Sequence, residues 1–304
     1  MSKQGERAMV PEAEFRSYYG RPILKEPAWR TPDVPGYLFL GGLAGASAST
    51  AALADLTGLP ALRRIGRLVA AGAAAASVGA LVHDLGRPER FLYMLRVFKP
   101  TSPLSVGSWI LAPFSGVTSA VAAAELAGRV PRLARLAGLA SGVLGPAMCT
   151  YTSVLLADTA TPAWHEAYRE LPFLFAGGSL TSGAGAALLA GPTDQAAPAR
   201  RMGWAGAALE VAASVRMERS HGITSEPYRT GTPGRLLRIG QGLTVAGGVL
   251  SALGRRRRWV SALAGAAYLA GGACMRFGVF EAGRASARDP KYVVIPQRER
   301  LSSS

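Results

Sequence analysis

Long apolar runs separated by short polar connections dominate the chain from about residue 34 to residue 280. A helix needs about 17–25 mostly apolar residues to cross a hydrocarbon core about 30 Å thick. The pattern predicts eight such spans, at residues 34–56, 65–82, 106–126, 136–157, 171–190, 202–215, 236–253 and 259–280. The sixth is short and contains Glu210, so it is the weakest of the eight. The fold class that follows is an all-α membrane protein.

Composition points the same way. Hydrophobic residues make up 49% of the 304 residues and charged residues only 17%, whereas soluble domains carry about 25% charged residues. The net charge of +15 comes from short basic clusters between apolar runs. Such clusters are typical of a topology signal rather than of a nucleic-acid surface, so we expect membrane lipid and no nucleic acid as a partner.

An even number of spans places both termini on one side of the membrane. The loops after the first, third, fifth and seventh spans contain twelve arginines and three acidic residues. The arginines are Arg63, Arg64, Arg67, Arg129, Arg132, Arg135, Arg200, Arg201 and those at 255–258. Compact basic loops are typical of the cytoplasmic side. The other side has more basic residues in total, but they lie in longer, charge-balanced segments. We therefore expect both termini on the outer side of the cell membrane. The bias toward Ala, Arg and Gly favours a bacterial source of the protein. The first thirty residues contain no apolar segment, so the first span is expected to direct insertion.

The most polar boundary follows the second span, in the segment His83-Asp84-Leu85-Gly86-Arg87-Pro88-Glu89-Arg90-Phe91. An acid just inside lipid is costly unless it is paired, and Arg87 is the nearest candidate partner of Asp84. In a functional interpretation, His83 and Asp84 exchange protons with a ligand held at the membrane edge. In a structural one, the segment is a helix-terminating turn whose charges lie among lipid headgroups. Residue chemistry alone favours neither.

This segment, followed by Pro103-Leu104-Ser105-Val106-Gly107-Ser108-Trp109, resembles the signature of the NrfD-like family, the membrane subunits of polysulfide reductase and related molybdopterin oxidoreductase complexes. Three further stretches are similar to the family in the same order. They are Tyr151-Thr152-Ser153-Val154-Leu155-Leu156; Pro162-Ala163-Trp164 with Leu171-Pro172-Phe173-Leu174-Phe175; and Gly271-Gly272-Ala273-Cys274-Met275-Arg276-Phe277. The likeness covers about residues 33 to 284. Ser153 stands where the family pattern has Gly.

The resemblance implies two four-helix bundles at 34–157 and 171–283, joined by an outer loop at 158–170 and flanked by polar tails at 1–33 and 284–304. It also implies a quinone pocket in the first bundle, near the face that docks an iron–sulfur subunit. Tyr151 matches a tyrosine associated with the quinone, and Asp84 matches an acid implicated in proton handling. His83 and Arg87 belong to the same motif. Asp158 is a less certain match to an acid near the pocket, and a solvated loop acid is its simpler interpretation.

The residue types are compatible with these roles. Tyr151 can donate a hydrogen bond to a quinone carbonyl, although interfacial tyrosines are also common in membrane proteins. Glu210 and Arg276 are the ionisable residues deepest in the predicted spans, and such residues usually face the bundle interior. The two are expected to pair, as part of a proton route or as a structural ion pair, unless Arg276 extends toward the nearby span end.

Cofactor chemistry within the chain is restricted. A haem in the membrane commonly needs two axial histidines and an iron–sulfur cluster needs about four thiolates. The chain has three histidines, of which only His83 adjoins a span, and two isolated cysteines. We therefore expect no haem and no cluster, and menaquinone or ubiquinone as a diffusible substrate. Electrons would come from a ferredoxin-like iron–sulfur subunit beside a molybdopterin catalytic subunit, as in formate dehydrogenase- or polysulfide reductase-like complexes, with this chain not catalytic alone. The alternatives are a secondary transporter or proton-conducting module, and a purely structural anchor.

Overall fold

The computed structural model describes residues 23–303; residues 1–22 and 304, which include most of the predicted polar N-terminal tail, lie outside the described part. Within the described part the regular structure is all helical. Eight helices have 20 or more residues. They are α1 (Asp33–Leu56), α2 (Pro60–Asp84), α4 (Pro103–Ala127), α5 (Pro131–Ala157), α7 (Leu171–Ala190), α8 (Ala197–Ser220), α10 (Gly231–Leu253) and α11 (Arg258–Arg288).

Shorter elements occupy the connections. They are α3 (Glu89–Met94), α6 (Pro162–Glu166), the 3-10 turn η1 (Gly222–Ser225), α9 (Glu226–Arg229) and α12 (Lys291–Ser303). The polar C-terminal tail predicted at 284–304 is therefore helical over most of its described length.

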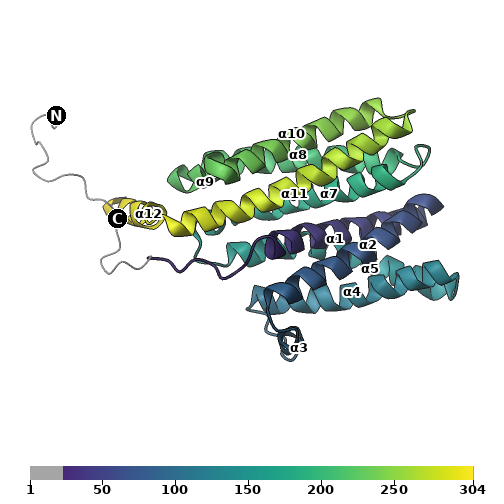
Figure 1. Ribbon diagram of the computed structural model, residues 1–304, viewed down its shortest axis with the longest axis horizontal. Coiled ribbons are helices and arrows are strands. Elements are labelled where there is room, and N and C mark those ends of the chain that lie inside the picture. Colours follow the sequence, from purple (N-terminus) through teal and green to yellow (C-terminus); the bar gives the residue numbers. More distant parts are fainter. Residues whose placement is uncertain (1–22, 304) are drawn as a thin grey trace, which may run out of the picture.

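Seven of the long helices have the length and hydropathy to cross a membrane, which confirms an all-α membrane protein. The eighth, α8, is long enough but carries Arg200 and Arg201 near its start and Arg216, Glu218 and Arg219 near its end. It nevertheless packs against α7 and α10 (Figure 1). We therefore treat α8 as the predicted sixth span, whose charges lie mostly at its two ends.

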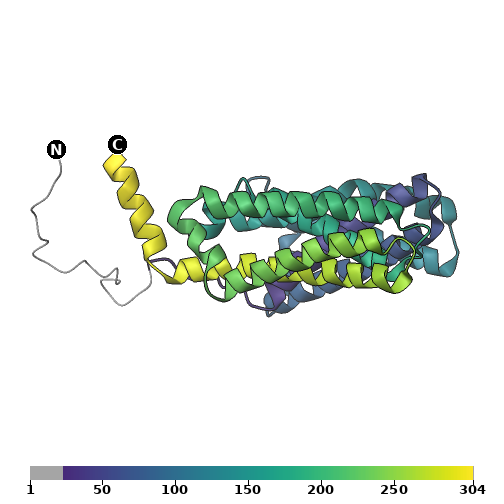
Figure 2. The same cartoon turned by 90° about the horizontal axis from the view of Figure 1, so that it is seen from above.

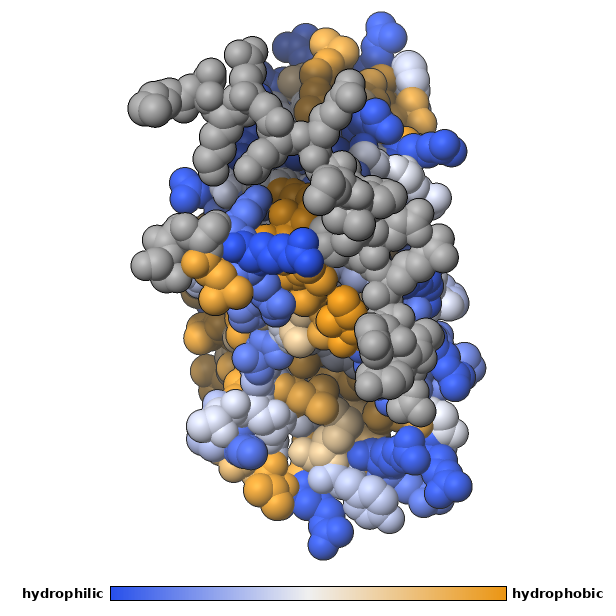
Figure 3. All heavy atoms as spheres, turned by 90° about the vertical axis from the view of Figure 1, so that its left-hand side faces the viewer, coloured by the Kyte–Doolittle hydropathy of each residue, from blue (hydrophilic) through white to orange (hydrophobic). Residues whose placement is uncertain are grey.

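The long helices run alternately up and down, so the molecule has two distinct ends (Figures 1 and 2). The loop end holds the connections α1–α2, α4–α5, α7–α8 and α10–α11. The terminal end holds α3, α6, α9, α12 and the start of the described chain. Seen from the terminal end, hydrophilic side chains lie among smaller hydrophobic patches (Figure 3). The prediction that both termini lie on one side agrees with this arrangement.

Helices α1, α2, α4 and α5 form one group and α7, α8, α10 and α11 a second, and α1 and α5 pack against α7 where the groups meet. Small residues allow these close approaches. A Cβ on Gly45 of α1 would lie 2.5 Å from the carbonyl oxygen of Gly145 on α5. Since lipid tails are as apolar as the side chains, such close backbone packing is a main source of association between membrane helices.

Proline explains where many helices begin. It stands in the first two positions of α2, α4, α5, α6, α7, α8 and α9. Its missing N–H costs nothing at that position and its fixed φ suits a first turn. The helices therefore extend beyond the apolar runs; α2 begins at Pro60, before the predicted start at residue 65.

Candidate functional site

A small cavity lies at the terminal end of the first helix group. Its volume is about 30 Å³, which is room for a water molecule or two. The side chains around it come from α1, α2, α4, α5, α3 and the segment before α1. The lining residues are Trp29, Val34, Tyr37, Leu81, Asp84, Met94, Pro103, Leu104, Gly107, Ser108, Leu111, Tyr151 and Leu155.

Two tyrosines form the polar inner wall of this cavity. The hydroxyl groups of Tyr37 on α1 and Tyr151 on α5 hydrogen-bond to each other, and either can be the donor. Their rings meet edge to face, with centroids 6.4 Å apart. Tyr151 is only 8% exposed. It therefore points into the bundle, and an interfacial belt position is excluded.

Asp84 lines the same cavity from the end of α2. Its carboxylate accepts a hydrogen bond from the backbone N–H of Arg30, at 2.9 Å. Arg87, the partner expected from the sequence, lies exposed in the turn after Gly86, which has a φ of +69°. This left-handed residue directs the chain away from Asp84, so the expected Asp84–Arg87 pair is not formed.

His83 is placed differently from its neighbour. Its side chain is 76% exposed and its Nδ1 lies 2.8 Å from a carboxylate oxygen of Asp33. Neither His83 nor Arg87 lines the cavity. The motif after the second span therefore contributes one carboxylate to the cavity and two basic groups to the surface of the terminal end.

The two motifs that the sequence analysis grouped together meet at this cavity. Asp84 comes from the first, and Pro103, Leu104, Gly107 and Ser108 come from the second, in the first two turns of α4. Gly107 is required for the fit, because a Cβ at this position would lie 2.7 Å from the ring of Tyr151. The second motif thus shapes the space beside the tyrosine.

A second cavity of about 230 Å³ adjoins the first. Met94 and Leu104 line both cavities, so these two side chains stand between them. Val97 lines this second cavity, together with Lys99, Ser102 and Ser105. Leu92, Tyr93 and Phe98 are exposed on α3 and on the loop that follows it, so apolar side chains gather on the outer surface of this segment.

The segment before α1 closes the cavity and connects it to the second helix group. Trp29 lines the cavity and stacks on Trp164 of α6, with ring centroids 5.8 Å apart. A carboxylate oxygen of Glu26 lies 2.7 Å from guanidinium nitrogens of both Arg284 and Arg288 on α11. The hydrogen bonds from Arg288 and Arg284 outweigh partial burial and hold the pKa of Glu26 below its ordinary value.

Glu210 and Arg276 lie in the second helix group. Both are buried, at 0% and 2% exposure, so Arg276 does not extend to the span end. They face each other across Gly178, where a Cβ would lie 3.1 Å from a Glu210 oxygen and 3.2 Å from a nitrogen of Arg276.

The expected Glu210–Arg276 ion pair is wrong as a direct contact. Thr244 and Thr181 donate hydrogen bonds to the two carboxylate oxygens of Glu210, at 3.0 and 3.3 Å. Arg276 donates to the carbonyl of Phe175 at 2.6 Å and to Ser179 at 3.1 Å. The carboxylate of Glu210 is therefore satisfied by neighbouring hydroxyl groups, whereas Nε and Nη1 of Arg276 have no hydrogen-bond partner among the described residues.

Asp158 is exposed immediately after the C-terminus of α5 and does not line the cavity. The simpler interpretation, a solvated loop acid, agrees with this position.

Sequence reasoning missed Tyr37 and Trp29, which line the cavity together with Tyr151. A tyrosine in an apolar run and a tryptophan in a polar segment carry no local signal, because their roles depend on which helices become neighbours.

The family model described as "Polysulphide reductase, NrfD" matches residues 25–196, which include the whole first helix group, the cavity and α7. No curated protein matches the chain. The resemblance inferred from the motifs is confirmed by this match. The likeness of the segment 271–277 lies beyond the matched residues and stays a prediction.

Proposed function

We propose, from the premise that this chain belongs to the NrfD polysulphide reductase family, that its terminal-end cavity is the site where a membrane quinone exchanges electrons and protons. As a member of the family, the chain is a multi-pass membrane subunit of a polysulfide reductase-like complex.

One observation carries it. Two tyrosine hydroxyls and a carboxylate line the same cavity at the end of a membrane-spanning bundle, beside an otherwise mostly apolar wall. A quinone head has two carbonyl acceptors and an apolar ring, and a tyrosine hydroxyl is a donor that can serve one carbonyl. Ligand sites of this kind are mostly apolar, with a few polar groups that fix orientation.

The cavity must enlarge to admit a ring, because about 30 Å³ holds little more than water. The adjoining 230 Å³ cavity supplies the space once Met94 and Leu104 move aside. Methionine is unbranched and flexible, which suits a side chain that yields to a ligand. The exposed apolar residues between 92 and 98 provide a path for the isoprenoid tail from the lipid.

Each polar group then has a task. The quinone supplies the two-electron, two-proton chemistry when bound. Tyr151 donates a hydrogen bond toward one carbonyl oxygen, and Tyr37 holds the Tyr151 hydroxyl in place. Asp84, fixed by the backbone N–H of Arg30, takes up or releases a proton at the cavity wall. His83, exposed and paired with Asp33, passes protons to or from the solvent. That Arg87 belongs to the quinone site stays a prediction from its motif.

Electrons are proposed to arrive from a ferredoxin-like iron–sulfur subunit docked on the terminal end, with a molybdopterin subunit carrying the substrate chemistry. The chain's two cysteines cannot hold a cluster of their own. The site lies at the same end as α3, α6, α9 and α12, so a subunit covering this end would bring its cluster toward the tyrosines.

The test measures quinone-coupled turnover of the purified complex in Asp84→Asn and Tyr151→Phe variants. Both should assemble with the partner subunits and lose turnover by about 100-fold, the lower part of the range for acid–base groups. Asp158→Asn and Tyr168→Phe are matched controls, because both residues are exposed at the terminal end, outside the cavity and outside the proposed tail path. Asp84→Asn and Tyr151→Phe complexes that turn over quinone as well as these controls would reject the proposal and leave the structural anchor.

A second candidate function, proton conduction through the second helix group, is favoured by one observation. Two nitrogens of the buried Arg276 have no hydrogen-bond partner among the described residues, and the carboxylate of Glu210 lies across Gly178 from one of them. Buried ionisable groups in membrane helices commonly mark ion pathways. Proton flux into liposomes containing the chain should stop in Glu210→Gln if this function is real, while quinone turnover without a proton gradient persists.

A further inference from the structure

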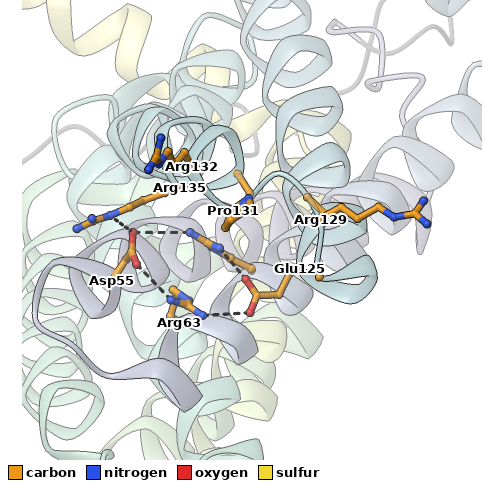
Figure 4. A pocket seen from close by; sticks show the side chains of 11 residues that line it. Asp55, Arg63, Glu125, Arg129, Pro131, Arg132 and Arg135 are labelled. Carbon is orange, nitrogen blue, oxygen red and sulfur yellow. Dashed lines mark hydrogen bonds and ion pairs between the residues drawn. The ribbon is translucent and has the colours of Figure 1, made fainter.

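A cavity of about 490 Å³ opens at the loop end, on the opposite side of the first helix group from the tyrosine pair. Five arginines and two acidic residues line it, from α1, α2, α4 and α5 and the α4–α5 loop (Figure 4). The charged lining residues are Asp55, Arg63, Arg67, Glu125, Arg129, Arg132 and Arg135. Neither the quinone site nor the proton chemistry proposed above uses any of them.

The two carboxylates are fully engaged within this cluster. Asp55 accepts from Arg63 at 3.4 Å and from Arg135 at 3.1 Å, and lies 3.7 Å from Arg67. Glu125 accepts from Arg67 at 2.6 Å and from Arg63 at 3.3 Å. All four carboxylate oxygens therefore face arginine already (Figure 4). The two acids neutralise two of the five guanidinium groups, and three positive charges stay uncompensated around the cavity.

Two of the arginines are available to a ligand. Among the described residues, Arg129 and Arg132 have neither an ion pair nor a hydrogen bond from their side chains, and both are exposed at the cavity. Arg63 also has a buried Nε without a hydrogen-bond partner in the described part of the chain. An arginine fork with free N–H groups matches the oxygens of a phosphate or carboxylate.

Helix orientation adds to the positive potential. Helices α2 and α5 both begin at the loop end, and neither has an acidic residue in its first turn. Arg63 and Arg132 lie in these first turns instead. The N-terminus of a helix carries a partial positive charge, which disfavours arginine and favours an anion. A bound anion would therefore offset the unfavourable placement of Arg63 at the N-terminus of α2 and of Arg132 at the N-terminus of α5.

The surroundings identify the kind of anion. Leu126, Val130, Leu133 and Leu136 are exposed on the same helix ends that line the cavity. Apolar side chains on the outer surface of membrane helices face acyl chains, so a lipid can lie there with its headgroup in the cavity. Basic pockets between membrane helices bind anionic lipid headgroups in this way.

We infer that this arginine-lined cavity binds a phosphate group, and that the phosphodiester headgroup of an anionic membrane lipid is its occupant. The site holds the ends of α1, α2, α4 and α5 together at the loop end. Arg63, Arg67 and Arg135, ordered by Asp55 and Glu125, form the inner wall. Arg132 and Arg129 contact the phosphate from the rim, for which the Arg129 side chain, extended away from the cluster in Figure 4, turns inward.

The experiment uses the full-length chain in a mild nonionic detergent, with any subunits that accompany it. Its melting temperature is followed as phosphatidylglycerol, phosphatidylcholine or inorganic phosphate is added, and retained lipid is identified by mass spectrometry. The double variant Arg129→Gln with Arg132→Gln is compared with Arg255→Gln with Arg256→Gln. The control removes the same charge from an exposed loop at the same end, outside the cavity.

Phosphatidylglycerol should raise the melting temperature of the wild-type chain and the control, and be retained on purification. The variant of Arg129 and Arg132 should melt like the control without lipid, yet need about tenfold or more lipid for half of the rise. Equal responses of the two double variants would mean diffuse attraction and overturn the site. An equal rise with phosphatidylcholine, or with inorganic phosphate at the same concentration, would overturn the anionic lipid as occupant.

Discussion

Gly107 of α4 lies against the aromatic ring of Tyr151 on α5, close enough that a Cβ at residue 107 would come within 2.7 Å of the ring. The position of the Tyr151 hydroxyl beside Tyr37 therefore depends on the absence of a side chain on the neighbouring helix. This dependence makes Gly107 a steric probe of the proposed quinone site.

Gly107→Ala should lower quinone-coupled turnover by about tenfold or more, because the added methyl group displaces the ring and disturbs the hydrogen bond between the tyrosines. Gly116→Ala on the same helix is the matched control, since a Cβ there meets nothing within 4 Å. Steady-state kinetics with a soluble quinone analogue measures the effect. Equal turnover of the two variants would show that the exact position of the Tyr151 ring is unimportant.

Tyr37→Phe should reduce turnover nearly as much as Tyr151→Phe, and the double variant should be little worse than either single one. The two hydroxyls bond to each other, so removing one leaves the other misplaced, and residues that act as a unit are not additive. A double-mutant cycle on quinone turnover tests this. Fully additive losses would mean that each tyrosine acts independently.

Gly283→Ala should destabilise the protein by about 1–3 kcal/mol, the usual range for overpacking. A Cβ on Gly283 of α11 would overlap the fully buried indole of Trp164. That indole cannot retreat, since it packs between Trp29 and Phe280 and donates to the carbonyl of Val279 at 2.8 Å. Thermal unfolding in detergent, compared with Gly242→Ala at an open helical position, measures the difference. A Gly283→Ala protein as stable as Gly242→Ala would contradict the packing argument.

Glu170, at the start of α7, should stabilise the protein at neutral pH and lose this effect in acid. Burial raises the pKa of its carboxyl, but hydrogen bonds from Arg216 at 2.9 Å and from His221 at 3.0 Å outweigh burial and hold the pKa below the ordinary 4.5. A lowered folded-state pKa contributes stability above the unfolded value, and this is lost as the pH falls through the folded value.

The measurement compares melting temperatures of wild-type and Glu170→Gln proteins at pH 7 and at about pH 4. The wild type should melt higher at pH 7, and the difference should shrink in acid. Glu166→Gln, a more exposed acid nearby, controls for surface charge. A constant difference across this range would contradict the proposed ion pairs.

A reporter fused after Ser304 should be active outside the cytoplasm, and one inserted in the α10–α11 loop should be active inside. The arginine-rich connections lie together at the loop end, opposite the described termini. Basic loops are retained in the cytoplasm. The reverse activities would move the quinone site to the cytoplasmic side.

The hydrophobic pattern predicted the positions of the long helices, because apolar runs of that length have few alternatives to a membrane helix. It placed their ends less well. The predicted end of the last span was residue 280, whereas α11 continues to Arg288, because a helix does not stop where lipid stops. Sequence also could not place α12 or the 3-10 turn, which depend on local capping rather than on hydropathy.

The candidate site was predictable in part. The motifs around Asp84 and Gly107 and the tyrosine at 151 were identified as belonging together, and they line one cavity. The pairing of Asp84 with Arg87 was wrong, because sequence proximity says nothing of the turn at Gly86. Glu210 and Arg276 are buried near each other, as expected, but each forms hydrogen bonds with other neighbours instead of with its expected partner.

The ten described residues before α1 contact both the cavity and α11. Trp29 lines the cavity, the backbone N–H of Arg30 bonds to Asp84, and Glu26 pairs with Arg284 of α11. A minimal membrane core that starts at Asp33 would therefore keep every span and still lose one wall of the cavity. Fusions intended to shorten the chain, or to place a tag directly before the first span, should leave residues 23–32 intact.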